Sequence, residues 1–201
     1  MRGILPIVEG EGDQKAVPYL IRRILHEVSQ DYAVQVLTPH KRGDLPKVRR
    51  QFERWYETAL LEDALVLWVM DFDCADCVDH EAAREALLTR ARKVNPSGVL
   101  EVVFMVKEFE SIFLHDDEAL RIAFPELSSE RPMPRDPEGI RNAKGWISDS
   151  LPRGRAYKET VDQARLCHHI DLDRVRQASA SYARFEAAVR ALLTRNTIHT
   201  L

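Results

Sequence analysis

The chain has 201 residues, of which 45% are hydrophobic and 30% are charged. This composition suits one compact domain, or one domain with a short addition. The longest apolar runs, residues 64–70 and 102–106, are too short to span a membrane, and the apolar run near the N-terminus is too short for a signal peptide. Three cysteines form no disulfide framework. We therefore expect a cytoplasmic protein without a membrane segment.

Charge is distributed unevenly along the chain, although the formal net charge is only −3. Residues 131–201 contain 13 Lys and Arg against 8 Asp and Glu, whereas residues 1–130 contain 16 against 24. This distribution fits a carboxylate-rich site beside a cationic surface. Solvated helix faces of mixed charge explain the composition equally well.

Apolar patterns predict alternating strands and helices over the first 106 residues. Continuous or β-branched apolar runs predict strands at residues 3–8, 32–37, 64–70 and 99–106. Helical spacing predicts helices at residues 16–28, 48–60 and 81–94, with a loop at 38–46. Strands of this kind, joined by helical crossovers, are typical of a parallel sheet with helices on both faces.

The rest of the chain is predicted to be helical. A helix is expected over residues 109–120, followed by a linker or exposed loop at 127–137 and helices over 138–201. We therefore predict an α/β domain at residues 1–126, with a helical C-terminal extension at 127–201 packed on it.

Acidic residues follow three of the four predicted strands. Glu9 follows the first strand, with Asp13 shortly after it, and Asp71 and Asp73 follow the third. Two further glutamates follow the fourth strand, at positions 108 and 110. Functional residues of parallel α/β sheets gather beyond the carboxyl ends of the strands. We therefore expect these side chains to share one edge of the sheet.

The Asp71-x-Asp73 pair suggests a metal site at that edge. In an extended chain the two carboxylates point the same way, and their repulsion is costly without a cation. Mg²⁺ prefers oxygen ligands, and Glu9 from a neighbouring strand would complete a cup of three carboxylates. The alternative is structural, because Asp is also common in turns and at helix N-termini.

The order of these motifs resembles the TOPRIM fold of topoisomerases, primases and OLD-family nucleases. The resemblance rests on Val8-Glu9-Gly10-Glu11-Gly12-Asp13 and on Val69-Met70-Asp71-Phe72-Asp73. Residues 107–114, the pair Tyr157-Lys158 and the helices that follow resemble, more narrowly, an uncharacterised bacterial TOPRIM-like family. Members of that family are often encoded beside AAA/ABC-type ATPases in loci that resemble phage-defence systems.

The resemblance implies a phosphodiester site that uses Mg²⁺ or Mn²⁺. It makes Glu9 a metal ligand or general acid/base, and makes Asp71 and Asp73 metal ligands. Asp13, Glu108 (or Glu110) and Lys158 match further acidic positions and a downstream lysine of OLD-like nucleases. For Asp13 a helix cap, and for Lys158 an ordinary surface charge, remain alternatives. The choice between Glu108 and Glu110 depends on whether the chain there is extended or helical, and Glu108 is favoured because it is nearer the strand end.

Other polar residues have weaker claims to a function. Cys74-x-x-Cys77 with His80 is too small a set for a structural zinc site. Basic clusters at residues 40–54 and 131–158 can neutralise phosphates. Trp55 and Tyr56 beside the first cluster can stack on bases, although their spacing favours the core. Adjacent His168 and His169 point apart on a helix.

The function expected from the sequence is metal-dependent hydrolysis of nucleic-acid phosphodiesters, on DNA or RNA. The resemblance implies that the protein acts with an ATPase partner in phage defence or DNA repair. Any ATP hydrolysis would belong to that partner, since the sequence contains no Walker A motif. The alternative is a non-catalytic module that binds and regulates an ATPase. The oligomeric state stays open, with a homodimer among the candidates.

Overall fold

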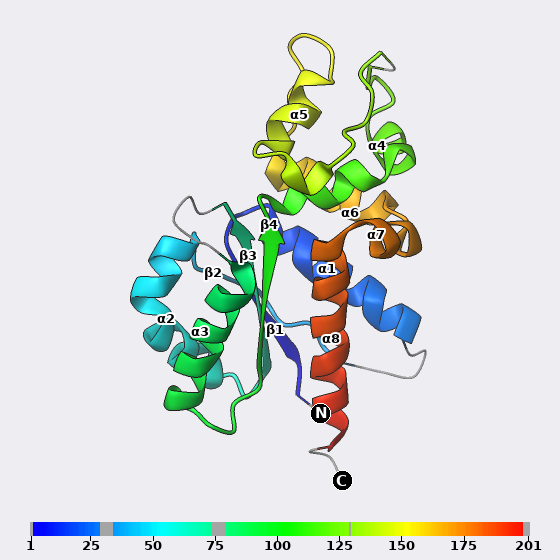
Figure 1. Ribbon diagram of the computed structural model, residues 1–201. Helices are drawn as coiled ribbons and strands as arrows, with labels where there is room; N and C mark the ends of the chain where they lie inside the picture. Colours follow the sequence, from blue (N-terminus) through cyan, green and yellow to red (C-terminus); the bar gives the residue numbers. More distant parts are fainter. Residues whose placement is uncertain (1, 29–33, 74–78, 129, 199–201) are drawn as a thin grey trace.

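A four-stranded parallel sheet forms the centre of the molecule in the computed structural model, which describes residues 2–28, 34–73, 79–128 and 130–198 (Figure 1). The strands lie in the order β2-β1-β3-β4, and every neighbouring pair is parallel. Their bounds are β1 Ile4–Val8, β2 His40–Lys41, β3 Leu65–Phe72 and β4 Leu100–Val106. The predicted α/β class with a parallel sheet flanked by helices is confirmed.

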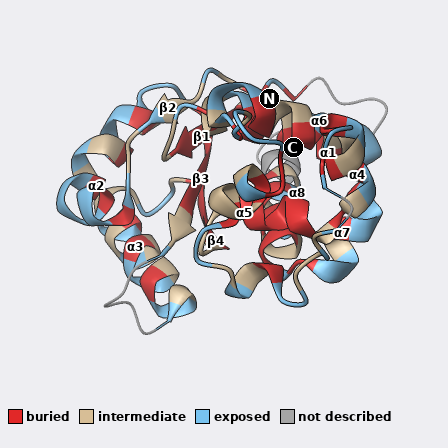
Figure 2. Ribbon diagram, turned by 90° about the horizontal axis from the view of Figure 1, so that it is seen from above, coloured by how far each residue is buried: buried red, intermediate tan, exposed pale blue. Residues whose placement is uncertain are grey.

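Helices cover both faces of this sheet, as the apolar strands require. The long helices α1 (Asp13–Val28) and α8 (Ala180–Ile198) lie on one face, and α2 (Leu45–Leu60) and α3 (His80–Val94) lie on the other. Viewed from above, the buried residues concentrate on the strands and on the helix surfaces that face them (Figure 2). Alternate residues of each strand therefore enter different cores.

Aromatic side chains fill the core between the sheet and helices α2 and α3. Phe52 and Tyr56 of α2 are fully buried, and the ring of Phe52 stacks on that of Trp68 in β3 with centroids 5.0 Å apart. Burial of such side chains contributes roughly 1.5–3 kcal/mol each to folding. The helical spacing that predicted Phe52 and Tyr56 in the core is confirmed, while Trp55 is only partly buried.

The second strand is the main error of the sequence-based prediction. The described part of residues 32–37 contributes only an isolated bridge between Val36 and Ile4. The strand that pairs with β1 is His40–Lys41, inside the predicted loop at 38–46. Pro39 lies between the two pairing sites and has no N–H to donate, so the ladder is interrupted there.

Short helical segments lie over the carboxyl ends of the strands (Figure 1). The predicted helix at 109–120 is a 3₁₀ segment followed by α4, and the predicted helical C-terminal region begins with a loop and single turns. Their bounds are η1 Phe109–His115, α4 Asp117–Ala123, η2 Pro137–Gly139, α5 Ala143–Asp149, η3 Glu159–Gln163, α6 Ala164–His169 and α7 Leu172–Ala178. Among the helices in the described ranges, none has the length and apolarity needed to cross a membrane.

The boundary between α7 and α8 shows how local polar contacts break an apolar stripe. The hydroxyl of Ser179 accepts a hydrogen bond from the backbone N–H of Tyr182 and donates one to Glu138. This is the contact that a helix N-cap makes. The stripe that predicted one continuous helix is therefore divided between two helices, while Val175, Tyr182 and Phe185 all remain buried.

Candidate acidic site at the carboxyl edge of the sheet

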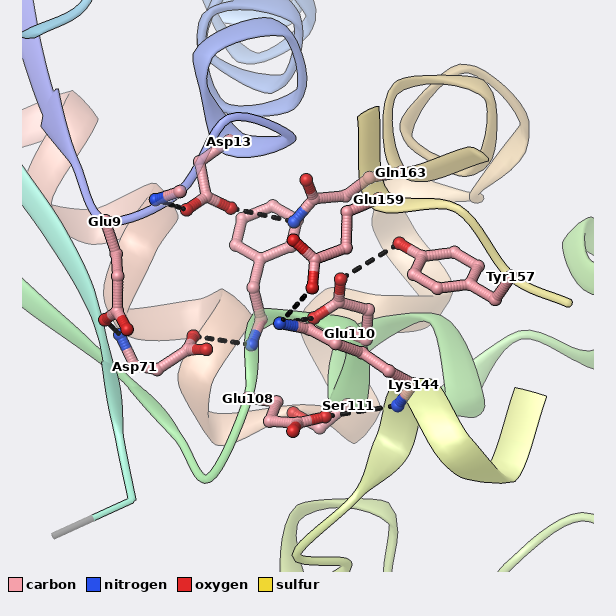
Figure 3. Close-up of polar contacts among 12 residues, drawn as sticks. Glu9, Asp13, Asp71, Glu108, Glu110, Ser111, Lys144, Tyr157, Glu159 and Gln163 are labelled. Atoms are coloured by element: carbon pink, nitrogen blue, oxygen red, sulfur yellow. Dashed lines mark hydrogen bonds and ion pairs between the residues drawn. The ribbon is translucent and has the colours of Figure 1, made fainter. Parts of the chain in front are cut away.

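Glu9 and Asp71 meet where two neighbouring strands end. Glu9 follows the last residue of β1, and Asp71 is the penultimate residue of β3. The Oε2 atom of Glu9 accepts a hydrogen bond from the backbone N–H of Asp71 at 3.2 Å. In Figure 3 the carboxylate of Glu9 reaches the backbone of Asp71, while the side chain of Asp71 extends further into the site, toward the turn after β4. Parallel pairing of β1 with β3 thus brings together carboxylates 62 positions apart.

A strained turn at the end of β4 brings a third acidic residue into the site. Lys107 has a φ of 65°, which is uncommon for a residue with a side chain. The N–H of Glu108 donates to the carbonyl of Val106 across it at 3.0 Å, which makes a tight three-residue turn. The next N–H, of Phe109, donates to Oδ1 of Asp71 at 2.8 Å, and Glu110 is fully buried behind it.

Asp13 joins the site from the first turn of α1. One of its oxygens accepts from the N–H of Gly10, and the other accepts from Nε2 of Gln163, both at 2.8 Å. Gly12 makes this approach of η3 possible, because a Cβ at that position would lie 2.1 Å from Oε1 of Gln163. Glu9, Asp13, Asp71 and Glu110 are called the acidic site below.

Lys144 of α5 is the cation that faces the acidic site. Its Nζ lies 2.7 Å from Oε1 of Glu159 and 3.8 Å from Oε2 of Glu110 (Figure 3). The hydroxyl of Tyr157 donates to the other oxygen of Glu110 at 3.0 Å. Oε2 of Glu110 is buried without a hydrogen-bond partner among the described residues. The ammonium group of Lys144 therefore compensates the charge of more than one carboxylate.

Burial and neighbouring negative charges raise the pKa of Glu9, Asp71 and Glu110. Burial raises the pKa of Asp71 well above its usual range, and the charges of Glu110, Glu9 and Asp13 raise it further. Burial and the charge of Asp13 also raise the pKa of Glu9, against the effect of its hydrogen bond from Asp71. Burial raises the pKa of Glu110 to about 8, against the charge of Lys144.

The pKa of Lys144 is also raised, but for a lysine this favours the charged form. Burial lowers its pKa, but the charges of Glu110, Glu159 and Asp71 outweigh that effect and raise the pKa overall. The ammonium group is therefore held in its charged form at neutral pH. The acidic site remains a place where negative charge is only partly compensated.

The predicted site residues divide into two groups. Glu9, Asp13 and Asp71 come together, whereas Asp73 is turned toward Nε of Arg141 at 3.3 Å. Glu108 accepts from the backbone N–H of Lys144 at 3.1 Å and so anchors the first turn of α5. Lys158 is exposed, and its backbone N–H donates to Asp162.

Several residues of the site were not assigned from the sequence, and Glu110 had been ranked behind Glu108. Lys144 lies on a seven-residue helix and Glu159 begins a π-helical turn, so neither belongs to a long periodic pattern. The sequence motif directed attention to Lys158, but it is the neighbouring Tyr157 whose side chain points toward Glu110. The acidic-edge pattern was the one signal that pointed to Glu110. The structure selects Glu110 over Glu108 and adds Lys144, Tyr157, Glu159 and Gln163.

The cysteine motif and the histidine pair do not extend this site. Cys74 and Cys77 lie outside the described residues, and Cys167 is buried as a free thiol. His168 contacts the hydroxyl of Tyr19 on the surface. In the described ranges, no three His, Cys, Asp or Glu side chains stand close enough to hold one metal ion together.

The donor chemistry of the acidic site nevertheless suits a hard divalent cation. Mg²⁺ is commonly bound by one or two carboxylates, with waters and substrate phosphates completing its shell. Glu9 and Asp71 each use one oxygen in a hydrogen bond to a backbone N–H, and the other oxygen has no partner among the described residues. Besides burial, the charges of Glu110, Glu9 and Asp13 raise the pKa of Asp71, and a cation at this place would offset that repulsion. The residues present therefore fit such an ion.

Comparison with protein families decides how the chain is classified. Residues 8–190 match the family described as "Domain of unknown function (DUF4276)". The chain belongs to the DUF4276 family. The match includes Glu9, Asp71, Glu110 and Lys144, so the whole acidic site lies within the DUF4276 region. No curated protein and no solved structure matches the chain.

Proposed function

We propose that this DUF4276 protein is a metal-dependent phosphodiesterase that hydrolyses DNA or RNA. The observation that carries the proposal is the convergence of Glu9 and Asp71 at the carboxyl ends of β1 and β3, where burial and neighbouring carboxylates raise the pKa of each. Carboxylates that are kept close and undercompensated are typical of sites that bind a cation or transfer protons. The position at the carboxyl edge of a parallel sheet agrees with this role.

In this proposal Glu9 and Asp71 hold Mg²⁺ or Mn²⁺, and Asp13 adds negative charge beside them. The ion supplies Lewis acidity and activates water for attack on phosphorus. The hydrogen bonds from Asp71 N–H to Glu9 and from Phe109 N–H to Asp71 orient the two carboxylates. Gln163 fixes Asp13 in the same way from η3.

Lys144 takes the role that the sequence had suggested for Lys158. Its ammonium group faces the carboxylates and stays charged, so it can offset the negative charge that develops on a phosphate. Glu110 has a pKa of about 8, and groups that titrate near the working pH are suited to proton transfer. Tyr157 keeps the Glu110 carboxyl group oriented.

The finer relation to TOPRIM and OLD-family nucleases is part of the same proposal. The order of the Glu9 motif and the Asp71-x-Asp73 motif supports it, as does their meeting at one sheet edge. The same resemblance leads us to propose an AAA/ABC-type ATPase as partner, in phage defence or DNA repair. Any ATP hydrolysis would belong to that partner, because the sequence contains no Walker A motif.

A cleavage assay tests the proposal. Labelled single- and double-stranded DNA and RNA are incubated with the protein in Mg²⁺, in Mn²⁺ and in EDTA. The assay is run with and without an ATPase encoded by an adjacent gene. We expect cleavage that requires the metal and that falls at least about 100-fold in Asp71→Asn. Asp63→Asn is the matched control, because Asp63 is exposed in the turn before β3, at the opposite edge of the sheet.

One observation favours the alternative of a non-catalytic ATPase-binding module. Lys144 already contributes positive charge to the acidic cluster without a metal. If that charge suffices, neither Mn²⁺ binding nor cleavage will depend on Asp71. If Asp71-dependent Mn²⁺ binding and cleavage are both absent with the ATPase present, the nuclease function is rejected and a non-catalytic ATPase-binding module is favoured.

A further inference from the structure

A second hollow adjoins the acidic site on the side of β2. Its volume is about 510 Å³, within the range of roughly 300–1,000 Å³ that is usual for ligand sites. Glu9 and Glu159 line it as well as facing the acidic site, so the two are continuous. We call it the cationic recess, after the basic residues on one wall. Its lining consists of Glu9, Gly10, Glu11, Lys41, Arg42, Gly43, Lys47, Glu159 and Thr160.

Arg42 lacks the partner that most partly buried arginines have. Its Nε atom is buried without a hydrogen-bond partner, and no carboxylate among the described residues forms an ion pair with it. In contrast, Arg90 and Arg176 each reach a glutamate at 2.5 Å. The guanidinium group also contacts the carbonyl of Lys41 at 3.4 Å and lies 5.9 Å from the centroid of the Trp55 ring. These neutral partners do not offset its charge, and a partly desolvated charge without an anion is costly unless a ligand supplies one.

The guanidinium group of Arg42 is also held in place. Its Nη2 donates to Nδ1 of His40 at 3.2 Å, because arginine has no acceptor. His40 therefore carries its proton on Nε2, which donates to Oε1 of Glu62 at 2.6 Å. This relay leaves Arg42 positioned on the wall of the recess without neutralising it.

Lys47 and Lys41 add positive charge to the same wall. Gly43 has a φ of 81°, and a Cβ there would lie 3.1 Å from Cδ of Lys47. The missing side chain thus lets the Lys47 stem lie against the loop, and its Nζ has no ion-pair partner among the described residues. Within the described ranges, the one ion pair of Lys41 is with Glu11, at 2.9 Å on the exposed rim.

We propose that the cationic recess binds a polynucleotide phosphate adjacent to the phosphate that is cleaved. Cleavage of the neighbouring phosphate rests on the proposed function, whereas binding of a phosphate in the recess does not require catalysis. An oriented guanidinium group with a neighbouring ammonium group is the pairing that recognises phosphate oxygens. The carboxylates that also line the recess would repel that phosphate, so we place it at Arg42 and Lys47, beside the metal site. The phosphate is either internal or the 5′-terminal one.

Binding in EDTA tests the recess separately from catalysis. The fluorescence anisotropy of a short labelled oligonucleotide is measured with the full-length wild-type protein, Arg42→Gln and Lys47→Gln. We expect each variant to bind about tenfold more weakly. The slope of log K against log salt should fall by roughly 0.7 for a single strand, as for one lost phosphate contact. Lys93→Gln is the control, since Lys93 is exposed at the far end of α3.

Two arms of the experiment identify the phosphate. A loss seen only with a 5′-phosphorylated oligonucleotide indicates the terminal phosphate, and an equal loss without that group indicates an internal one. Binding by both variants as tight as wild type, or an equal loss in Lys93→Gln, would overturn the proposal. Absence of metal-dependent cleavage with the binding losses intact would instead remove only the proposed function.

Discussion

Two sets of buried carboxylates in this protein differ in how their charge is compensated. Glu186 of α8 lies 2.5 Å from Nε of Arg176 and 2.6 Å from Nη2 of Arg190. Asp116 accepts from two backbone N–H groups and from Arg174. Glu110 and Asp71 at the sheet edge share one lysine, and one oxygen of Glu110 has no hydrogen-bond partner among the described residues. The first set stabilises the fold, and we propose that the second binds a cation.

Removal of a carboxylate from the structural set should have the largest effect on stability. Asp116→Ala deletes the N-cap of α4 and leaves the N–H of Asp171 without its acceptor, so we expect a loss of about 3 kcal/mol. Urea denaturation measures it. Asp117→Ala, which breaks an exposed ion pair with Arg121 in the same helix, should cost less than about 1 kcal/mol. Equal losses would contradict the comparison.

The pH dependence of stability should identify the functional set. The folded protein raises the pKa of Glu110 from 4.5 to about 8, so the folded state binds the proton more tightly than the unfolded state. The stability from this group is therefore complete below pH 4.5 and is lost as pH rises toward 8. In EDTA we expect the melting temperature to fall by about 5 °C across this window. Glu110→Gln should flatten the fall, and an unchanged profile would contradict the assignment.

Lys144 should compete electrostatically with a divalent cation. Lys144→Gln removes one positive charge from beside Asp71 and Glu9, so Mn²⁺ should bind about tenfold more tightly. Calorimetric titration measures the affinity, and Lys93→Gln again controls for the change in net charge. If Mn²⁺ bound more weakly to Lys144→Gln, Lys144 would be organising the ligands rather than opposing the ion.

The smallest expected effect concerns the hydroxyl of Tyr157. Tyr157→Phe deletes a buried hydrogen bond to Glu110 and should cost about 1 kcal/mol of unfolding free energy. Tyr19→Phe deletes the contact with His168 at the surface and should cost less, because water replaces it. Chemical denaturation of the two variants side by side checks the difference.

Much of the fold could be predicted from the sequence, because apolar periodicity reports directly on the sheet and its long helices. The meeting of Glu9 and Asp71 follows from the same logic, since neighbouring parallel strands end at one edge. The second strand was misplaced because a two-residue ladder around Pro39 leaves no periodic signal. Short elements that are fixed by tertiary contacts are the hardest to predict.

The remaining part of the site depends on such contacts. Lys144 reaches the carboxylates only because α5 lies over the sheet edge, and Glu108 anchors that helix through a backbone N–H. The choice between Glu108 and Glu110 depended on the positive φ of Lys107, which composition does not reveal. Lys158 was favoured through a family resemblance, whereas in the structure its neighbour Tyr157 points into the site.

A crystal structure of the protein grown with MnCl₂, with anomalous scattering recorded at the manganese edge, would test the central claim most directly. We predict a manganese ion, marked by its anomalous peak, within bonding distance of the carboxylates of Glu9 and Asp71. The ammonium group of Lys144 should then have moved away from Glu110, keeping at most its ion pair with Glu159. A peak elsewhere, or none while Lys144 keeps its contacts with Glu110 and Glu159 in saturating Mn²⁺, would contradict the claim.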